Sequence, residues 1–332
     1  MTSGTATITL KGLQGGVEGR LAQVRDEIRR LIEADFPLIT QANSHLIRMQ
    51  GKMFRPTLVL LADAATAGTP AADSRPVSLA AVVELIHLAT LVHDDAVDHS
   101  VLRRGMPTLN ALFSHQVAVI MGDYLYSRAV IELVRLGELD PLRILSRVTN
   151  EMTIGEMRQL LAHDPLAFTE ADYDLLIRAK TATLISGACE VGGIRGTFLE
   201  RAALRQYGEG LGMAFQIVDD LLDFTGVEAD TGKPAGHDLR EHKVTLPLIH
   251  ALPRMSPGQR ARVAALLENP EPSDGEIAGV VEAVEERGGL DYARTRARAF
   301  CAQAEVALDE LSPSPARERL RASLTFVLER RS

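Results

Sequence analysis

Apolar residues recur along most of the chain at spacings of three and four residues, which is the period of an amphipathic helix. Alternating apolar and polar runs bounded by turns, which would indicate strands, are almost absent. The pattern predicts an all-α protein with about ten or more helices. Gly, Pro, Asp and Ser gather in short stretches that we interpret as loops rather than domain linkers, at 66–76, 103–108, 225–238, 268–276 and 312–316. We therefore expect a flexible segment over 1–19 and a single all-α domain over 20–332.

Two segments, 79–98 and 211–224, are apolar around most of their circumference, so we predict that both are buried central helices. Each contains an aspartate cluster with the spacing DDxxD. The clusters are Asp94, Asp95 and Asp98 in the first segment, and Asp219, Asp220 and Asp223 in the second. Because residues i and i+4 share a helix face, the first and last aspartate of each cluster can reach one point in space.

Carboxylates this close together need a positive partner. At about 4 Å and an effective dielectric near 20, two of them repel by roughly 4 kcal/mol, and apolar flanks add a desolvation cost. Mg²⁺ prefers oxygen ligands and typically completes its shell with substrate phosphates. A single cluster would be read as a solvated helix end, but two copies favour a magnesium-bridged phosphate compound. A calcium loop is disfavoured because neither cluster has the EF-hand spacing.

Cations stand where a diphosphate ligand would need them, beside Gly and Pro turns or near the aspartates. They are Lys52, Arg55, Arg103, Arg104, Lys180, Lys233 and Lys243. Thr169 and Asp172 have the spacing of a capping box, which predicts the start of the helix that carries Lys180 and Thr181. Without further information, we interpret His87, two turns before Asp94, as a core histidine. No nucleophile set, P-loop or dinucleotide-binding motif is present in the sequence.

Composition narrows the class of protein. The net charge of -8 and the lack of a basic block argue against nucleic-acid binding. The opening lacks the basic start and apolar core of a secretory signal, and no apolar run approaches the roughly 20 residues of a membrane span. Cys189 and Cys301 have no metal-binding or redox spacing. We expect a cytoplasmic protein with reduced cysteines and no transmembrane segment.

Taken together, the motifs resemble those of the trans-isoprenyl (polyprenyl) diphosphate synthase family. The matching stretches occur in the order of the family, and the resemblance covers roughly 20–330. They are GKMFRP, LVHDDAVDHSVLRRGMPT, MGDYLYSRA, AKTATL, FQIVDDLLDFTG and GKPAGHDLREHKVTLPL. The resemblance implies the isoprenoid synthase fold with a central cavity, and a Mg²⁺-dependent prenyltransferase that adds isopentenyl diphosphate head to tail to an allylic diphosphate.

The resemblance also assigns roles to individual residues. The isopentenyl diphosphate site would consist of Lys52, Arg55, His87 and Arg104. The allylic diphosphate would be held by Arg103, Lys180, Thr181, Gln216, Lys233 and Lys243. Asp94, Asp98 and Asp219 would lead the magnesium ligands, and Asp95, Asp220 and Asp223 would complete the clusters, directly or through water. The groups closest to the chemistry would be Asp94, Asp95, Asp98, Lys180, Asp219 and Asp220, with three Mg²⁺ ions when substrate is bound.

The chain departs from the family at two positions. Gln50 and His242 stand where the family usually has glycine. Neither change removes a charged ligand, so we expect an effect on loop shape or affinity. Whether His242 contacts the allylic diphosphate is an open question at this stage. The released diphosphate would accept the final proton, which agrees with the lack of a dedicated general base in the sequence.

Product length depends, in this family, on the residues four and five positions before the first aspartate. Here they are Thr90 and Ala89, and such small side chains leave room for a long chain. Burying five more carbons would gain roughly 3–4 kcal/mol per added isoprene unit. We therefore predict a product of C30 or more, extended from farnesyl or geranylgeranyl diphosphate. In the alternative, these two residues only pack, and a deeper side chain such as Met121, Tyr124 or Tyr126 closes the tunnel early.

Three other functions stay open. The chain could be a geranylgeranyl or farnesyl diphosphate synthase with a short product. It could be a class I terpene cyclase, although a full DDLLD and a second diphosphate site argue against that. It could also be a non-catalytic partner subunit, but such subunits are expected to lose aspartates. The family implies a homodimer, and the helices around 111–134 could form its interface.

Overall fold

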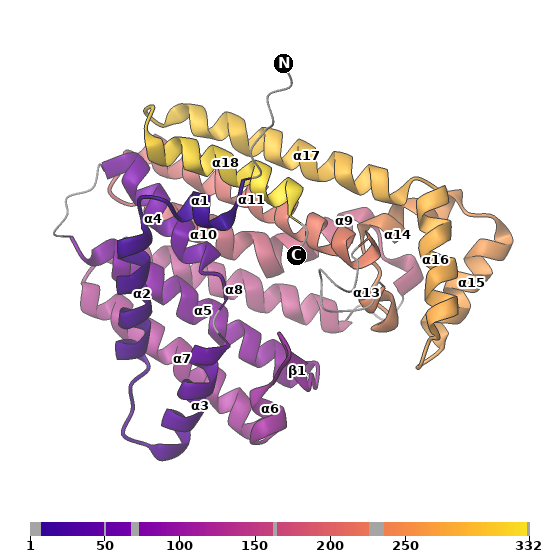
Figure 1. The fold of residues 1–332 in the computed structure, drawn as a ribbon, viewed down its shortest axis with the longest axis horizontal. Coiled ribbons are helices and arrows are strands. Elements are labelled where there is room, and N and C mark those ends of the chain that lie inside the picture. The colour runs from indigo at the N-terminus through magenta and orange to yellow at the C-terminus, as the bar shows by residue number, and fades with distance from the viewer. Residues whose placement is uncertain (1–7, 50, 68–72, 162–164, 226–235, 331–332) are drawn as a thin grey trace. The chain divides into compact units, whose positions relative to one another are not determined.

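The structure, a computed structural model, describes residues 8–49, 51–67, 73–161, 165–225 and 236–330 (Figure 1). These residues form two compact units. Unit 1 comprises Met1–Thr149, Gly187–Arg205 and Leu308–Ala322, and unit 2 comprises Asn150–Ser186, Gln206–Ala307 and Ser323–Ser332. The all-α prediction is confirmed, because helices dominate the described residues and the strands there are two residues long. The single domain and the central cavity stay predictions.

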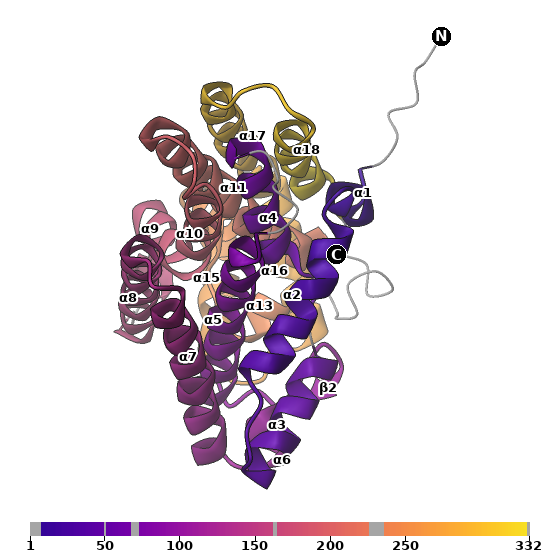
Figure 2. The same ribbon diagram turned by 90° about the vertical axis from the view of Figure 1, so that its left-hand side faces the viewer.

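Unit 1 is built around α5, the segment predicted to be a buried central helix. Its elements are α1 (Leu10–Gln14), α2 (Glu18–Leu31), α3 (Pro37–Arg48), α4 (Phe54–Ala67), α5 (Arg75–Val97), the hairpin β1 (Leu102–Arg103) and β2 (Met106–Pro107), α6 (Leu109–Leu112), α7 (His115–Leu136) and the 3₁₀ turn η4 (Leu308–Glu310). Figure 2 shows α5 flanked by α7 and α2, and α4 also packs on it. Leu13 of α1 is buried, so part of the predicted flexible segment is packed.

The sequence explains why α5 lies inside this unit. Every residue over 79–86 is at most 3% exposed, so the helix is covered all round rather than on one face. The helix is long and apolar enough to cross a membrane, but 78% of its most apolar window is buried within the protein, as in a core helix. On α7, Gly122 allows close approach: a Cβ there would lie 2.3 Å from the His93 ring of α5.

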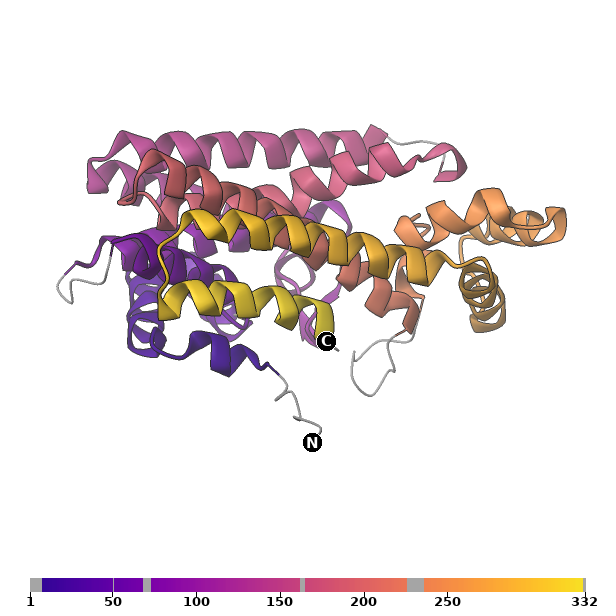
Figure 3. The same ribbon diagram turned by 90° about the horizontal axis from the view of Figure 1, so that it is seen from above.

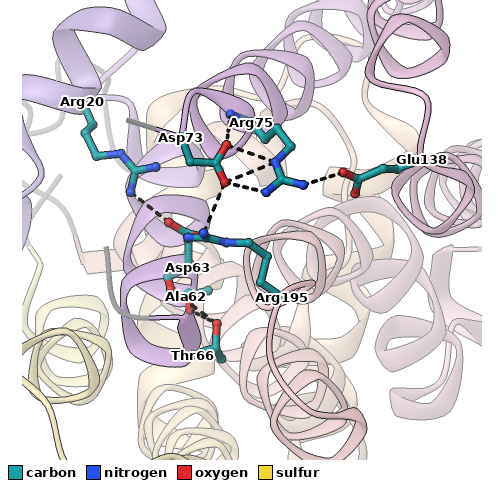
Figure 4. Close-up of polar contacts among 8 residues, drawn as sticks. All are labelled: Arg20, Ala62, Asp63, Thr66, Asp73, Arg75, Glu138 and Arg195. Carbon is teal, nitrogen blue, oxygen red and sulfur yellow. Dashed lines mark hydrogen bonds and ion pairs between the residues drawn. The ribbon is translucent and has the colours of Figure 1, made fainter. Parts of the chain in front are cut away.

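A charge network around the buried Asp63 connects several elements of unit 1 (Figure 4). The Asp63 side chain on α4 is 2% exposed and accepts hydrogen bonds from Arg20 Nη1 at 2.9 Å and Arg195 Nη2 at 2.6 Å. Arg195 Nη1 also donates to Asp73, which accepts from Arg75 as well. Hydrogen bonds from Arg75, opposed by burial, lower the pKa of Asp73 to about 2. The network therefore pairs carboxylates that could not be buried alone.

Unit 2 contains most of the second half of the chain. Its elements are η1 (Pro165–Ala167), α9 (Glu170–Ile177), η2 (Arg178–Ala182), α13 (His237–Arg240), α14 (Leu246–Ala251), η3 (Leu252–Arg254), α15 (Pro257–Glu268), α16 (Asp274–Glu286) and α17 (Gly289–Ala307). Figure 3 shows the long α17, which packs against α14 and α16. Four further helices have residues in both units: α8 (Leu139–Leu161), α10 (Thr183–Gly192), α11 (Phe198–Thr225) and α18 (Pro315–Glu329).

The helix starts in unit 2 follow local signals. The predicted capping box is present: Asp172 N–H donates to Thr169 Oγ1, and Thr169 N–H donates to the Asp172 carboxylate, which begins α9. The expected single helix over this region is interrupted, because η2 is a π-helical segment between α9 and α10. The segment 211–224 lies within α11, where Leu211, Met213 and Ile217 are fully buried, so that prediction is confirmed.

Candidate active site

The first aspartate cluster lies at the C-terminal end of α5 in unit 1, and its three carboxylates differ in exposure. Asp95 is buried, whereas Asp94 is half-buried and Asp98 is exposed. Arg103 Nε, from the hairpin that follows, donates to both Asp95 oxygens at 2.8 and 3.0 Å. Burial raises the pKa of Asp95, and the Arg103 charge opposes that rise. Arg103 therefore supports the buried aspartate, and the carboxylates of Asp94 and Asp98 remain on the more accessible side.

A basic cluster of unit 1 brings together three of the four residues assigned to isopentenyl diphosphate. Arg55 Nη1 donates to His87 Nε2 at 3.0 Å, across α4 and α5. Burial and the charges of Arg55 and Arg104 lower the pKa of His87 well below its usual value, so the ring is neutral and accepts this bond. Lys52 is exposed beside α4. The neutral histidine thus orients an arginine rather than adding a charge.

Arg104 is held in place by the backbone of the loop before α4. Its Nη1 donates to the Met49 carbonyl at 2.7 Å, and its own φ of 52° lies in the left-handed region. The guanidinium lies against Gly51, where an added Cβ would be 2.8 Å from Nη2. Buried Glu84 also interacts electrostatically with Arg55 and Arg104, and burial raises its pKa. The absence of a side chain at position 51 therefore leaves room for the Arg104 guanidinium.

The residues assigned to product length lie on α5 about one turn before the aspartates. Ala89 is 3% exposed, and Thr90 Oγ1 donates to the His87 carbonyl at 2.8 Å. Of the alternative tunnel-closing residues on α7, Tyr124 donates its hydroxyl to the Ile32 carbonyl at 3.0 Å, and Met121 is buried. The Tyr126 side chain is 37% exposed. Which of them limits the product stays a prediction.

The second aspartate cluster, on α11 in unit 2, shares one feature with the first, which is a buried middle aspartate. Asp220 is buried at 5%, the Asp219 side chain is 55% exposed, and Asp223 is half-buried. In both clusters the middle aspartate thus faces the protein interior. The first and third aspartates of each cluster are at least partly accessible.

Asp220 is hydrogen-bonded on both oxygens. Gln216 Nε2 donates to Oδ1 at 2.8 Å, and the Tyr173 hydroxyl of α9 donates to Oδ2 at 2.5 Å. Thr181 Oγ1 in turn donates to Gln216 Oε1 at 2.7 Å. Burial raises the pKa of Asp220 to about 8, with a further contribution from Asp238, while the two hydrogen bonds lower it. The structure therefore brings together three of the predicted site residues of unit 2.

Asp223 has a structural role at the start of α13. Its carboxylate accepts from the backbone N–H groups of His237 at 3.1 Å and Asp238 at 3.0 Å. Gly236, which precedes this helix, has φ of 77°. Burial, with the nearby Asp223 charge, raises the pKa of Asp238 to about 6. The third aspartate of the cluster thus anchors the segment that carries Lys243.

Lys180 and Thr181 lie within the π-helical segment η2. Lys180 Nζ is 2.8 Å from Glu156 Oε1 and donates to Gln159 Oε1 at 3.1 Å, both on α8. π-Helical segments are rare and occur frequently at functional sites, and the sequence pattern had indicated only an uninterrupted helix. The segment places these two predicted substrate contacts next to each other at the irregular turn.

The remaining basic positions are only partly described. Lys243 Nζ contacts Glu241 at 2.6 Å, and its backbone N–H donates to the Asp238 carbonyl. His242 has φ of 56°, which explains why glycine is usual there, and its ring Nε2 lies 2.8 Å from the Asn269 carbonyl oxygen. Lys233 and Gln50 lie outside the described residues. His242 is therefore engaged within unit 2.

Two residues of the site were missed by the sequence analysis. Tyr173 contacts Asp220, as described above, and Arg330 near the C-terminus contacts Asp219 Oδ1 at 3.0 Å. The Arg330 guanidinium is 3.9 Å from the Phe215 ring centroid and donates to the Phe215 carbonyl. The capping box pointed to the position of Tyr173 without indicating its partner, and no signal in the sequence marked Arg330.

The side chains of each cluster fit a hard cation. Asp94 and Asp98 of unit 1 and, separately, Asp219 of unit 2 offer only oxygen and are at least partly accessible. Within the parts of the chain that the structure describes, no three His, Cys, Asp or Glu residues are grouped as a complete metal site. Mg²⁺ is typically bound by one or two carboxylates and takes its remaining ligands from water and phosphate.

The comparison with protein families identifies the class. The Polyprenyl synthetase model matches residues 36–284, which is well over half of the chain. The chain belongs to this family, and it is a prenyltransferase of isoprenoid biosynthesis.

Three known proteins are similar over nearly the whole length. The octaprenyl diphosphate synthase of Escherichia coli strain K12 is 37% identical over 304 residues, 90% of this chain and 92% of that enzyme. A decaprenyl diphosphate synthase from Rhodobacter capsulatus gives a TM-score of 0.90 at 38% identity, covering 97% and 99% of the two chains. A polyprenyl synthase from Caulobacter crescentus, solved with calcium and isoprenyl diphosphate, gives a TM-score of 0.91 at 33% identity, covering 98% and 99%.

Proposed function

We propose that the chain is a Mg²⁺-dependent trans-polyprenyl diphosphate synthase. It condenses isopentenyl diphosphate head to tail with farnesyl or geranylgeranyl diphosphate and releases a product of C30 or more. The observation that carries the proposal is the shared design of the two aspartate clusters. In each, the middle carboxylate is buried and hydrogen-bonded, while the first and third are at least partly accessible. The long-chain synthases among the similar proteins support the product class.

The residues proposed for the two substrates come largely from different units. Isopentenyl diphosphate is bound in unit 1 by Lys52, Arg55 and Arg104, with neutral His87 orienting Arg55. The allylic diphosphate is bound with the help of unit 2, by Lys180, Thr181, Gln216 and Lys243. Lys233 and Arg103 belong to the same proposed set, Arg103 through its support of Asp95.

Mg²⁺ would be held by Asp94, Asp98 and Asp219, with Asp223 acting directly or through water, and we expect three ions with substrate. When bound, the ions neutralise charge on the allylic diphosphate and so stabilise it as a leaving group. Arginine and lysine side chains hold the same diphosphate and exclude water from it. The allylic C–O bond breaks, which releases the diphosphate and leaves an allylic carbocation. The isopentenyl double bond attacks this cation, and the released diphosphate accepts the proton that is lost. The protein needs no general base of its own.

We also propose that the enzyme is a homodimer and works in the cytoplasm. On α7, the large apolar side chains of Ile120, Ile131 and Val134 are between 55% and 63% exposed. A face of this kind suits a second copy of the same chain. Light scattering should give twice the chain mass, and Ile131→Glu should lower it. Among the described residues, the one helix long and apolar enough to span a membrane is α5, and its burial within unit 1 supports a location outside the bilayer.

The function is tested by incubating the purified protein with Mg²⁺, isopentenyl diphosphate and, separately, C10, C15 and C20 allylic diphosphates. Products are dephosphorylated and read by mass spectrometry. A ladder ending at C30 or above is expected. A stop at C15 or C20 would refute the long product but keep the chemistry. Cyclised hydrocarbons without consumption of isopentenyl diphosphate would indicate a cyclase, and no turnover would indicate a subunit that needs a partner.

A further inference from the structure

Tyr173 has the closest side-chain contact to the second aspartate cluster, and no role follows for it from the motifs. Its ring is 2% exposed, and its hydroxyl donates to Asp220 Oδ2 at 2.5 Å. The other oxygen of this carboxylate accepts from Gln216. The Asp220 carboxylate therefore has one donor on each oxygen, which fixes its rotation about the last side-chain bond.

The same contacts continue to the residues proposed to bind the allylic diphosphate. Because the Nε2 group of Gln216 points at Asp220, its Oε1 points the opposite way, toward the Thr181 hydroxyl that donates to it. The amide of Gln216 is thus oriented by the carboxylate, and the orientation of Thr181 follows from the amide. If the carboxylate turns, both side chains lose their partners.

Tyr173 is itself held in place, so it can anchor this series of hydrogen bonds. It follows directly on the capping box of Thr169 and Asp172, so the first turn of α9 is held. The preceding Glu170 also accepts a hydrogen bond from the Tyr292 hydroxyl of α17 at 2.7 Å. Two independent contacts therefore anchor the turn that presents the Tyr173 hydroxyl.

We infer that Tyr173 is a positioning residue, which holds Asp220 and through it Gln216 and Thr181 for binding of the magnesium allylic diphosphate. The inference rests on the proposed function and deepens it. The residues positioned by Tyr173 belong to unit 2, whereas the residues proposed for isopentenyl diphosphate belong to unit 1. Removing the Tyr173 hydroxyl should therefore affect binding of the allylic substrate alone. Loss of the hydroxyl should weaken allylic binding and leave isopentenyl binding unchanged.

The test is Tyr173→Phe, which keeps the buried ring and removes only the hydroxyl. Binding of a non-cleavable farnesyl thiodiphosphate with Mg²⁺ is measured by calorimetry. Because one buried hydrogen bond to Asp220 is lost, the dissociation constant should rise about two- to tenfold. The matched control is Tyr207→Phe, another buried tyrosine of unit 2, whose hydroxyl contacts Ser323 Oγ at 2.5 Å. That variant should bind the analogue like the wild type.

Steady-state kinetics give a second readout. In Tyr173→Phe the KM for the allylic substrate should rise, and the KM for isopentenyl diphosphate should stay within about twofold of the wild-type value. A general loss of stability would not produce this difference between the two KM values. Equal effects of Tyr173→Phe and Tyr207→Phe, or equal rises in both KM values, would overturn the inference. A wild-type protein that makes no product would instead refute the proposed function.

A double-mutant cycle tests whether Tyr173 acts through Asp220. Binding of the analogue is compared for Tyr173→Phe, Asp220→Asn and the double variant. If the tyrosine acts through Asp220, its removal has little further effect in the Asp220→Asn background. Full additivity of the two changes would show that Tyr173 acts by another route.

Discussion

Gly51→Ala tests the placement of Arg104 in the proposed isopentenyl diphosphate site. The new Cβ would lie 2.8 Å from Arg104 Nη2 and 2.9 Å from Nη1. Ordinary contact needs about 3.4 Å, so the guanidinium must move by about 0.6 Å. Its bond of 2.7 Å to the Met49 carbonyl would then lengthen to about 3.3 Å, at the end of the useful range. Gly51 is not among the glycines with positive φ, so alanine brings no backbone strain.

The magnitude follows from that bond. A hydrogen bond with a charged donor contributes about 1.5–3 kcal/mol, and losing roughly half of it corresponds to an interaction about four- to twelvefold weaker. We expect the KM for isopentenyl diphosphate to rise about tenfold, with little change in the KM for the allylic substrate. Steady-state rates with each substrate varied in turn measure both values.

The matched control for this prediction is Gly19→Ala on α2, where an added Cβ meets nothing within 4 Å. That variant should keep both KM values. If Gly51→Ala also leaves the KM for isopentenyl diphosphate unchanged, or raises both KM values equally, then the placement of Arg104 by Gly51 does not control binding of this substrate.

Three further predictions concern stability and product length. Asp63→Asn leaves two largely buried arginines without their carboxylate and should cost about 3–5 kcal/mol in the free energy of unfolding. Asp291→Asn, the control in an exposed ion pair, should cost less than about 1 kcal/mol. Equal melting temperatures of the two variants would contradict this prediction. Because the folded pKa of His87 lies below its unfolded value, the unfolded state binds more protons, and stability should fall as pH drops below about 6.5. His87→Gln should lose less stability between pH 8 and 5.5 than the wild type, and an equal loss would count against a buried neutral ring. Ala89→Tyr should shorten the product to about C15–C20 by mass, since it fills a position with 3% exposure, and an unchanged spectrum would exclude Ala89 from the tunnel wall.

The sequence was most informative where one residue decides a local structure. The continuous apolar run over 79–98 predicted the buried α5, and Thr169 with Asp172 predicted the start of α9. The spacing of the aspartates placed the first and last of each cluster on one helix face. These features depend on neighbours in the chain, and periodicity contains that information.

Contacts between distant residues could not be predicted in the same way. The spacing DDxxD does not tell which aspartate is buried, because burial depends on Tyr173 and Arg103, which come from other elements. Arg330 is 111 residues from Asp219 in sequence. The left-handed conformation of His242 was hidden because glycine, the usual signal, is replaced there. Tertiary partners, rather than local preference, decided these positions.

The π-helical segment Arg178–Ala182 has a consequence for comparing this chain with others. A π turn holds one residue more than an α turn, so every side chain after it is rotated by about 100° relative to an uninterrupted α-helix. A homologue that lacks one residue here would close the turn into a regular helix. The lysine and threonine would then face different neighbours, although an alignment would show only a single gap. Insertions and deletions at this point should therefore be judged by the direction of the side chains and not by sequence identity.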